Sequence, residues 1–310
     1  MLEVKELVKR YGKHTALDGI SFSAGEGEIV GLLGPNGAGK STAMNIITGY
    51  LSSDSGTVTV DGADILDEPD RVKRLIGYLP EIPPLYTDMK VSEYMDFVYD
   101  LKKCDLPRKA HLDEIAKVTK TADVQGRLIA NLSKGYRQRV GIASALVGDP
   151  KVLIFDEPTV GLDPGQIIET RALIRRLGRK HTVILSTHIL SEVQAVCDRI
   201  VIIDRGRIIA DEKTGEITAA VNRSRRWTVR VCGPVADVQR MIRNVEGVSG
   251  VEPTGERDLD ANVYIVESDK GRDVRKALFA ACASKGYALI GIEPSGMSLE
   301  EVFIKLTDKD

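Results

Sequence analysis

Apolar positions along the chain follow two periods, which alternate from the amino terminus onward. Apolar runs bounded by turn residues predict β-strands at residues 2–8, 20–23, 29–33, 57–61, 75–79, 151–155, 182–186, 199–204 and 207–210. Apolar residues spaced three or four positions apart predict helices at residues 42–49, over much of 91–146, at 166–178 and from 191 onward. Because strands and helices alternate, this pattern predicts an α/β fold whose sheet is mostly parallel.

One long helical stretch interrupts this alternation. Prolines at positions 80, 83 and 84 end the strand at residues 75–79, and Pro107 starts a helix within the stretch that follows. The strand pattern returns only at residue 151. We therefore expect residues 1–222 to form one domain with a mixed sheet and a helical insert at about residues 82–148.

The remainder of the chain predicts a smaller second domain at residues 227–310. Its pattern reads strand 227–231, helix 235–243, strands 248–252 and 262–266, helix 272–284, strand 288–292 and a last helix at 298–306. β-α-β-β-α-β is the ferredoxin-like order, so we expect a small α+β domain. The basic stretch at 222–226 fits a solvated linker better than a membrane-binding patch. No chemical motif is visible in this part, which favours a docking or regulatory role.

Composition narrows the classes of protein that fit. The 310 residues carry a formal net charge of -2, which argues against general nucleic-acid binding. The four cysteines are widely spaced, which argues against a zinc site and a disulfide framework. No apolar run reaches 18 residues, and the first residues lack a signal-peptide core, so we expect a cytoplasmic protein without a membrane span.

Residues 34–42 carry the strongest motif in the chain. The sequence Gly-Pro-Asn-Gly-Ala-Gly-Lys-Ser-Thr matches the phosphate-binding pattern Gly-x-x-x-x-Gly-Lys-Ser and lies between a predicted strand and a predicted helix. Glycines let backbone N–H groups approach a phosphate, and the helix N-terminus adds roughly half a positive charge. A glycine-rich turn with a solvated lysine is the disfavoured alternative. The expected nucleotide-binding residues are Gly34, Pro35, Asn36, Gly37, Ala38, Gly39, Lys40, Ser41 and Thr42.

Polar residues at the ends of two later strands point to the same edge of the sheet. Asp156 and Glu157 follow one apolar strand, and His188 follows the next. Ligands bind at the carboxyl ends of strands in open α/β sheets. There, Asp156 can help to hold Mg²⁺ and Glu157 can orient or deprotonate a water molecule. Taken alone, Asp156 and Glu157 are also consistent with an acidic turn, and His188 is also consistent with a hydrogen-bonded core histidine.

Residues 132–138, Leu-Ser-Lys-Gly-Tyr-Arg-Gln, complete a set of motifs. Together with the phosphate loop and Phe155-Asp156-Glu157, this stretch resembles the signature sequence of ATP-binding cassette (ABC) ATPases, with the motifs in the family's order over residues 2 to about 220. The resemblance implies ATP and Mg²⁺ as ligands, with Ser41 and Asp156 on the metal. It also implies that Glu157 acts as the base for the attacking water and that His188 contacts the γ-phosphate.

The resemblance implies roles for further residues outside the phosphate loop. Tyr11, at the end of the first predicted strand, matches the aromatic residue that stacks on adenine, although alone it would fit a packing role. Ser133, Gly135 and Gln138 belong to the signature, which binds the ATP held by a second subunit. Asp163 belongs to the loop that crosses between the two subunits. ATP is therefore expected to lie between two cassettes.

Two departures from the family pattern stand out. Glu81 occupies a position where the family usually has glutamine. A glutamate can still bind Mg²⁺ or orient water, but its charge repels that of Glu157, so we expect slower or more tightly gated hydrolysis. Lys134 and Tyr136 replace a glycine and a glutamine of the signature. This variant, with residues 78–81, 83–86 and 298–303, resembles the ATPases of ABC-2 type exporters, and within them the gliding-motility type.

The resemblance implies an ATP-binding and ATP-hydrolysing subunit of an ABC-2 type membrane transporter. We expect it to pair with a second ABC ATPase subunit, a copy of this chain in preference to a relative. It would drive a separate ABC-2 type transmembrane permease from the inner face of the cell membrane, docking near Glu81, Tyr86 and the Pro83-Pro84 turn. A soluble ABC-type ATPase in DNA repair or translation is disfavoured, because residues 40–133 show no sustained heptads and only one signature is present. A binding module with an inactive site is disfavoured by the intact motifs.

Overall fold

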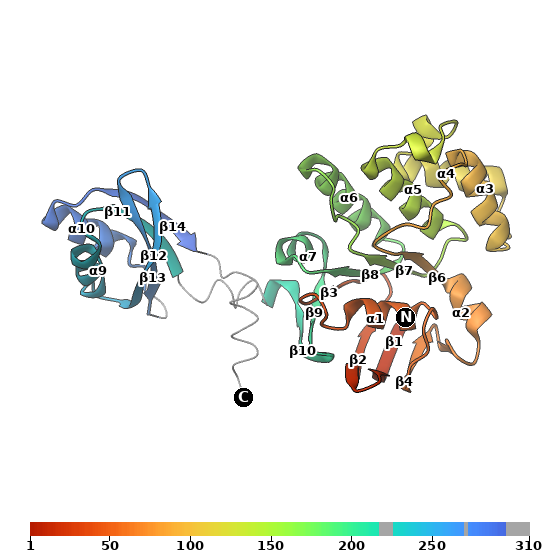
Figure 1. Ribbon diagram of the computed structural model, residues 1–310, viewed down its shortest axis with the longest axis horizontal. Helices are drawn as coiled ribbons and strands as arrows, with labels where there is room; N and C mark the ends of the chain where they lie inside the picture. Colours follow the sequence, from red (N-terminus) through yellow and green to blue (C-terminus); the bar gives the residue numbers. More distant parts are fainter. Residues whose placement is uncertain (217–225, 270–271, 296–310) are drawn as a thin grey trace. The chain divides into compact units, whose positions relative to one another are not determined.

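The computed structural model describes residues 1–216, 226–269 and 272–295 (Figure 1). The chain divides into two compact units, Met1–Thr214 and Gly215–Asp310. The helix predicted at 298–306 and residues 222–225 of the predicted linker lie outside the described residues. Within the described ranges, no helix combines the length and the apolar character needed to cross a membrane.

A six-stranded sheet forms the centre of the first unit, in the order β10-β9-β3-β8-β7-β6. All its pairs are parallel except that of the edge strand β10, as the sequence pattern predicted. Its central strands are buried along their whole length, as expected when both faces of a parallel sheet are covered. The strands are β3 (Ile29–Leu33), β6 (Ile76–Leu79), β7 (Val152–Asp156), β8 (Thr182–Thr187), β9 (Arg199–Asp204) and β10 (Arg207–Lys213).

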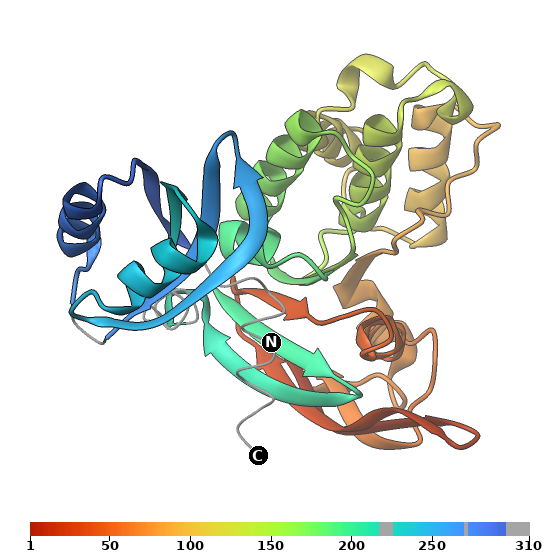
Figure 2. The same cartoon turned by 60° about the vertical axis from the view of Figure 1, so that its left-hand side comes forward.

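The predicted hairpin at the end of this sheet is present. β9 and β10 are joined by Arg205 and Gly206, both with positive φ (45° and 79°), as a tight two-residue hairpin turn requires. The N–H of Asp18 donates to the carbonyl of Gly206 at 2.8 Å. The hairpin therefore lies beside the antiparallel strands of the first unit (Figure 2).

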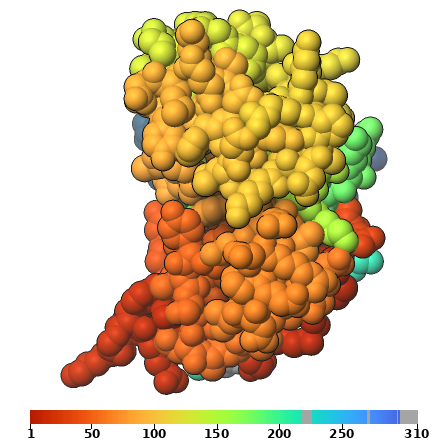
Figure 3. Space-filling view, turned by 90° about the vertical axis from the view of Figure 1, so that its right-hand side faces the viewer, coloured from red at the N-terminus to blue at the C-terminus, as the bar shows by residue number. Residues whose placement is uncertain are grey.

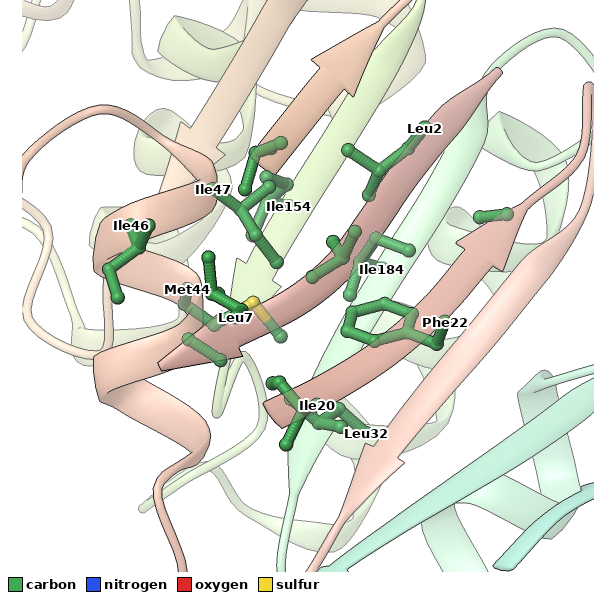
Figure 4. Close-up of a cluster of buried hydrophobic side chains, with 14 of the residues drawn as sticks. Leu2, Leu7, Ile20, Phe22, Leu32, Met44, Ile46, Ile47, Ile154 and Ile184 are labelled. Atoms are coloured by element: carbon green, nitrogen blue, oxygen red, sulfur yellow. The ribbon is translucent and has the colours of Figure 1, made fainter. Parts of the chain in front are cut away.

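The first strands of the chain form a separate antiparallel sheet, in the order β2-β1-β4-β5. The strands are β1 (Leu2–Tyr11), β2 (His14–Ala24), β4 (Ser55–Val60) and β5 (Ala63–Asp64). Helix α1 (Lys40–Ile47) packs between the two sheets, and side chains from all three elements, such as Leu7, Met44 and Ile184, form one buried cluster (Figure 4). This cluster fixes the start of α1 against the central strands.

Helices cover the other face of the central sheet (Figure 1). The predicted insert contains α3 (Val91–Leu101), α4 (Arg108–Thr119), α5 (Lys134–Leu146) and two short 3₁₀ turns (Ala122–Val124 and Ile129–Asn131). Pro107 precedes α4 as predicted. Two further helices follow the strands β7 and β8, namely α6 (Pro164–Leu177) and α7 (Leu190–Val196). Helix α2 (Pro69–Leu75), which the sequence analysis did not predict, lies just before β6.

The second unit has the β-α-β-β-α-β order that the sequence predicted. Its elements are β11 (Arg226–Cys232), α9 (Val235–Arg243), β12 (Val248–Asp258), β13 (Ala261–Ser268), α10 (Arg275–Lys285) and β14 (Leu289–Ser295). The strands pair antiparallel in the order β12-β13-β11-β14. Val229, Tyr264 and Leu278, from two strands and a helix, are fully buried in its own hydrophobic core.

Candidate functional site

The glycine-rich loop between β3 and α1 is held tightly against its neighbours. A Cβ at Gly34 would clash with the carbonyl oxygen of Ile203, and one at Gly39 would lie 2.6 Å from the carbonyl oxygen of Ala16. Gly39 also has a φ of 109°, a conformation that favours glycine. No side chain of the described residues caps the start of α1, so its first N–H groups remain available to an anion. The tip of the loop, residues 35–37, is exposed, whereas Ala38 is buried.

Lys40 folds back into this loop. Its Nζ donates to the carbonyl oxygens of Gly34 (2.7 Å) and Pro35 (3.1 Å), and the residue is only 6% exposed. Burial lowers the pKa of Lys40, while the negative charges of Glu157 and Asp156 act in the opposite direction. The ammonium group therefore lies where phosphate oxygens could replace the two carbonyls as acceptors.

Strand register brings the predicted polar residues to one edge of the sheet. Leu33 pairs with Thr187, Asp156 with Ser186, and Leu79 with Phe155. Because these strands are parallel, the residues that follow them leave the sheet at the same edge as the glycine-rich loop. These residues are Gly34, His188, Glu157 and Glu81.

Glu157 and His188 are in direct contact. His188 Nδ1 lies 2.9 Å from Glu157 Oε1. Glu157 is 9% exposed, and its Oε2 is buried with no hydrogen-bond partner in residues 1–216, 226–269 and 272–295. The residue has a φ of 47°, and its N–H donates to the carbonyl of Ser186 at 3.1 Å. A carboxylate with one oxygen held and the other free can accept a proton from a bound water.

Asp156 and Ser41 supply oxygen groups that could help to hold a hard cation. Asp156 is buried and accepts a hydrogen bond from the Ser186 hydroxyl, and Ser41 is exposed in the first turn of α1. Within the described part of the chain, no group of three or more His, Cys, Asp or Glu side chains could hold a metal. Mg²⁺ is commonly bound through one or two protein oxygens together with substrate phosphates, and Asp156 and Ser41 fit that arrangement.

The signature residues lie at the start of α5. Ser133 is its N-cap and accepts the N–H of Tyr136 at 3.3 Å, while remaining exposed. Gly135 is buried against α6, where a Cβ would lie 2.6 Å from the side chain of Gln166. Gln138 is also buried.

The loop after β7 lies against this signature segment. Asp163 caps α6 by accepting the N–H of Gln166 at 2.9 Å. A Cβ at Gly161 would clash with Nζ of Lys134, so the lysine that departs from the family pattern packs over this loop. Ser133 and Asp163 are thus exposed N-caps of neighbouring helices.

Two predicted residues are exposed at the surface. Tyr11 is 50% exposed at the end of β1, with Lys9 Nζ 5.8 Å from its ring centre. Glu81 is exposed in the segment after β6. An exposed ring is suited to stacking on a base, and an exposed carboxylate is free to reorient.

A buried polar cluster beside His188 was not predicted from the sequence. Glu192 accepts hydrogen bonds from the hydroxyls of Thr159 and Thr187, and the three residues are all buried. A glutamate four residues after His188 gives no local signal of burial, since glutamate is almost always exposed unless it is paired. We call these three residues the Glu192 cluster.

Comparison with known proteins places these motifs in a family. A family model described as "ABC transporter" matches residues 17–160. The chain is 33% identical over 315 residues, covering 100% of this chain and 99% of the relative, to the linearmycin resistance ATP-binding protein LnrL of Bacillus subtilis (strain 168). It is 32% identical over 309 residues, covering 99% and 92%, to the daunorubicin/doxorubicin resistance ATP-binding protein DrrA of Streptomyces peucetius.

Solved structures of ABC transporter cassettes also resemble this chain. An ATP-binding subunit of an ABC transporter matches with a TM-score of 0.65 and 30% identity, covering 72% of this chain and 93% of that one. The dimeric structure of a bacterial ABC transporter cassette matches with a TM-score of 0.63 and 27% identity, covering 69% and 99%.

Proposed function

This chain belongs to the ABC transporter family as an ATP-binding ATPase, and on that premise we propose that it is the motor subunit of an ABC-2 type exporter. In this proposal two cassettes close around ATP and drive a separate permease at the inner face of the membrane. The observation that carries it is the Glu157–His188 contact, at the same sheet edge as the loop that holds Lys40. Residues 1–222 would form the nucleotide-binding domain, with its insert at about 82–148, and residues 227–310 an accessory domain.

ATP would bind first to the glycine-rich loop. The uncapped N–H groups of α1 and the backbone of residues 34–42 would donate to the phosphates, and Lys40 would exchange its two carbonyl acceptors for phosphate oxygens. Tyr11 would stack on the adenine ring. Ser41, Asp156 and Glu81 would hold Mg²⁺, which neutralises charge on the phosphate oxygens.

Hydrolysis would then use the free oxygen of Glu157. Oε2 would accept a proton from a water whose oxygen attacks the γ-phosphorus, while the bond from that phosphorus to the β,γ-bridging oxygen breaks and releases ADP. His188 would keep Glu157 oriented through Nδ1 and contact the γ-phosphate through Nε2. The side chain of His188 is 44% exposed, so this second nitrogen can reach a ligand.

A second cassette would complete each site. Ser133, Gly135, Gln138 and Asp163 would serve the ATP bound by the partner, and the two exposed N-caps are well placed for that contact. The dimeric structure of the related cassette supports pairing, and we propose a second copy of this chain in preference to a relative. ATP binding would add contacts that only the closed dimer makes, which allows it to shift the equilibrium toward closure.

A groove on the helical-insert side offers a docking surface for the permease. It has a volume of about 840 Å³ between α1, α2 and the insert, on the face shown in Figure 3. Its lining includes Tyr50, Arg74, Tyr94 and Leu101. Tyr50 and Leu101 are 84% and 67% exposed, and such exposed apolar side chains mark interaction sites when they lie together. Nearby, Tyr86 packs edge-on against Phe97 of α3 and is half exposed, and we propose it as a contact.

The export direction rests on the relatives, two of which are named for resistance to linearmycin and to daunorubicin and doxorubicin. The experiment that tests the proposal is purification of the tagged chain from native membranes in mild detergent, with mass spectrometry of what co-purifies. A stoichiometric multi-span protein of the ABC-2 type is the expected result. Recovery of ribosomes or DNA-repair proteins, with no membrane protein, would instead support the soluble ATPase alternative.

A further inference from the structure

Glu192 is a charged residue buried next to the proposed catalytic pair. It lies in the first turn of α7, four residues after His188, and is 4% exposed. Its Oε1 accepts from Thr159 Oγ1 at 2.6 Å, and its Oε2 accepts from Thr187 Oγ1 at 3.0 Å. Nη2 of Arg171, on α6, lies 3.6 Å from Oε1. Both carboxylate oxygens are therefore used.

A further contact sets the direction of the hydrogen bond from Thr187. The N–H of Ile189 donates to Thr187 Oγ1 at 3.1 Å, so this hydroxyl accepts from the backbone and gives its own proton to Glu192. An acceptor is therefore needed opposite Thr187. Glutamate presents an acceptor to both threonine hydroxyls, whereas glutamine would present its oxygen to one of them and its amide N–H₂ group to the other.

The cluster connects two segments that leave neighbouring strands. Thr187 is the last residue of β8 and directly precedes His188. Thr159 stands two residues after Glu157, in the loop that continues to Asp163. Glu192 is thus bonded to the segment that carries His188 and to the segment that carries Glu157.

Stability alone does not account for this arrangement. A buried ion pair or charged network is often no more stabilising than well-packed apolar residues of similar volume, because the charges lose their hydration. Unlike apolar packing, the hydrogen bonds of the carboxylate are directional, so each bond fixes the position of one segment. The arrangement therefore fits a role in positioning the segments that carry His188 and Glu157.

We propose that Glu192 is a positioning residue for ATP hydrolysis, which holds Thr187 and Thr159 so that His188 and Glu157 keep their contact around the γ-phosphate. Thr159 also leads into the loop that ends at Asp163, which is expected to contact the partner cassette. Glu192 therefore links the chain's own ATP site to that loop. This inference rests on the roles proposed above for Glu157 and His188. It assigns Glu192 no contact with ATP.

The test compares Glu192→Ala, Glu192→Gln and the double variant Thr159→Val/Thr187→Val in the full-length chain. Steady-state ATPase kinetics, binding of a fluorescent ATP analogue and the thermal midpoint are measured for each. Glu26→Gln is the matched control, since Glu26 is exposed in the turn before β3. Misplacement of a reacting group by about 1 Å can cost a hundred-fold in rate. We expect kcat of Glu192→Ala to fall about that far, KM for ATP and analogue binding to change less than about three-fold, and Glu192→Gln to retain part of the rate.

The double variant supplies an independent check. If the threonines act through Glu192, adding Glu192→Ala to Thr159→Val/Thr187→Val lowers kcat little further, which is the non-additivity of residues that act as a unit. A kcat of Glu192→Ala within three-fold of wild type overturns the inference. So does a parallel loss of analogue binding and thermal midpoint in the Glu192→Gln and threonine variants, which would indicate a structural role.

Different results would contradict the proposed function and the positioning role of Glu192. If Glu157→Gln abolishes hydrolysis while the kcat of Glu192→Ala stays within three-fold of wild type, only the positioning role is wrong. If Glu157→Gln hydrolyses at the wild-type rate, the role of Glu157 is wrong, and with it the basis for placing Glu192 behind the pair.

Discussion

His188 holds one oxygen of Glu157 and leaves the other free: Nδ1 lies 2.9 Å from Oε1, while Oε2 is buried with no hydrogen-bond partner among the described residues. A buried oxygen that lacks a partner is costly, and a ligand bound at that oxygen would remove the cost. The water that attacks ATP is the ligand that our proposed mechanism supplies.

Replacing Glu157 with glutamine should stop hydrolysis without stopping ATP binding. The amide keeps the size of the side chain but cannot accept the proton from water, and loss of a general base typically costs about 10²- to 10⁴-fold. Phosphate release and binding of a fluorescent ATP analogue measure the two steps separately, with Glu26→Gln as the control. A phosphate release rate equal to that of wild type would exclude Glu157 as the base.

Removing the ammonium group of Lys40 should weaken ATP binding. Lys40→Met keeps the aliphatic stem but loses the donors that now bond the carbonyls of Gly34 and Pro35. Hydrogen bonds to charged groups contribute about 1.5–3 kcal/mol each, so we expect at least a ten-fold higher Kd for ATP. Lys13, exposed in the turn after β1, provides the control variant Lys13→Met. An unchanged Kd in Lys40→Met would contradict the assignment of this loop as the phosphate site.

Tyr11 should contribute to binding of the base and little to the fold. Its ring is half exposed, and stacking on a base is worth about 1–3 kcal/mol. Tyr11→Ala should therefore raise the Kd for ATP by about five-fold or more, whereas Tyr11→Phe should leave it near the wild-type value. Tyr50→Ala removes another exposed tyrosine outside the phosphate loop and serves as the control in the same fluorescence titration. Equal affinities for Tyr11→Ala and wild type would make Tyr11 a surface residue with no part in the site.

Glu81→Gln should raise the ATPase rate or change its stimulation by the permease. The glutamate stands after β6, next to the strand that carries Asp156 and Glu157, and adds a negative charge at an edge that must bind ATP. Phosphate release is compared with and without the co-purified permease. If both rates match wild type, the proposed gating by Glu81 is wrong.

Local sequence patterns were sufficient to predict the candidate catalytic edge. The loop at residues 34–42, Glu157 and His188 each follow a short apolar strand, so their place at the strand ends depends only on nearby residues. The roles of Ser133 and Asp163 came from the family resemblance and stay predictions.

Features that depend on distant residues could not be predicted. The antiparallel sheet requires Leu2 to pair with Val60, and no periodicity within either strand encodes that partner. The burial of Glu192 depends on Thr159, 33 residues away. The pattern of a single segment gives its type, whereas pairing and burial are set by tertiary packing.

Lys102, which follows α3, should make the stability of the fold depend on pH in the alkaline range. Its Nζ donates to the carbonyls of Ala145 (3.1 Å) and Val147 (2.9 Å) at the end of α5, and burial lowers its pKa to about 8. The folded state therefore holds this proton less tightly than the unfolded chain, whose pKa is near 10.5. Below pH 8 both states are protonated and the penalty for burying the charge is constant. Between pH 8 and 10.5 the folded state loses the proton first, so stability from this group should rise with pH, by about 3 kcal/mol in total. Urea unfolding of wild type and Lys102→Met at several pH values isolates this contribution, since other lysines titrate alike in both. A difference in unfolding free energy that stays constant from pH 7 to 10 would contradict it.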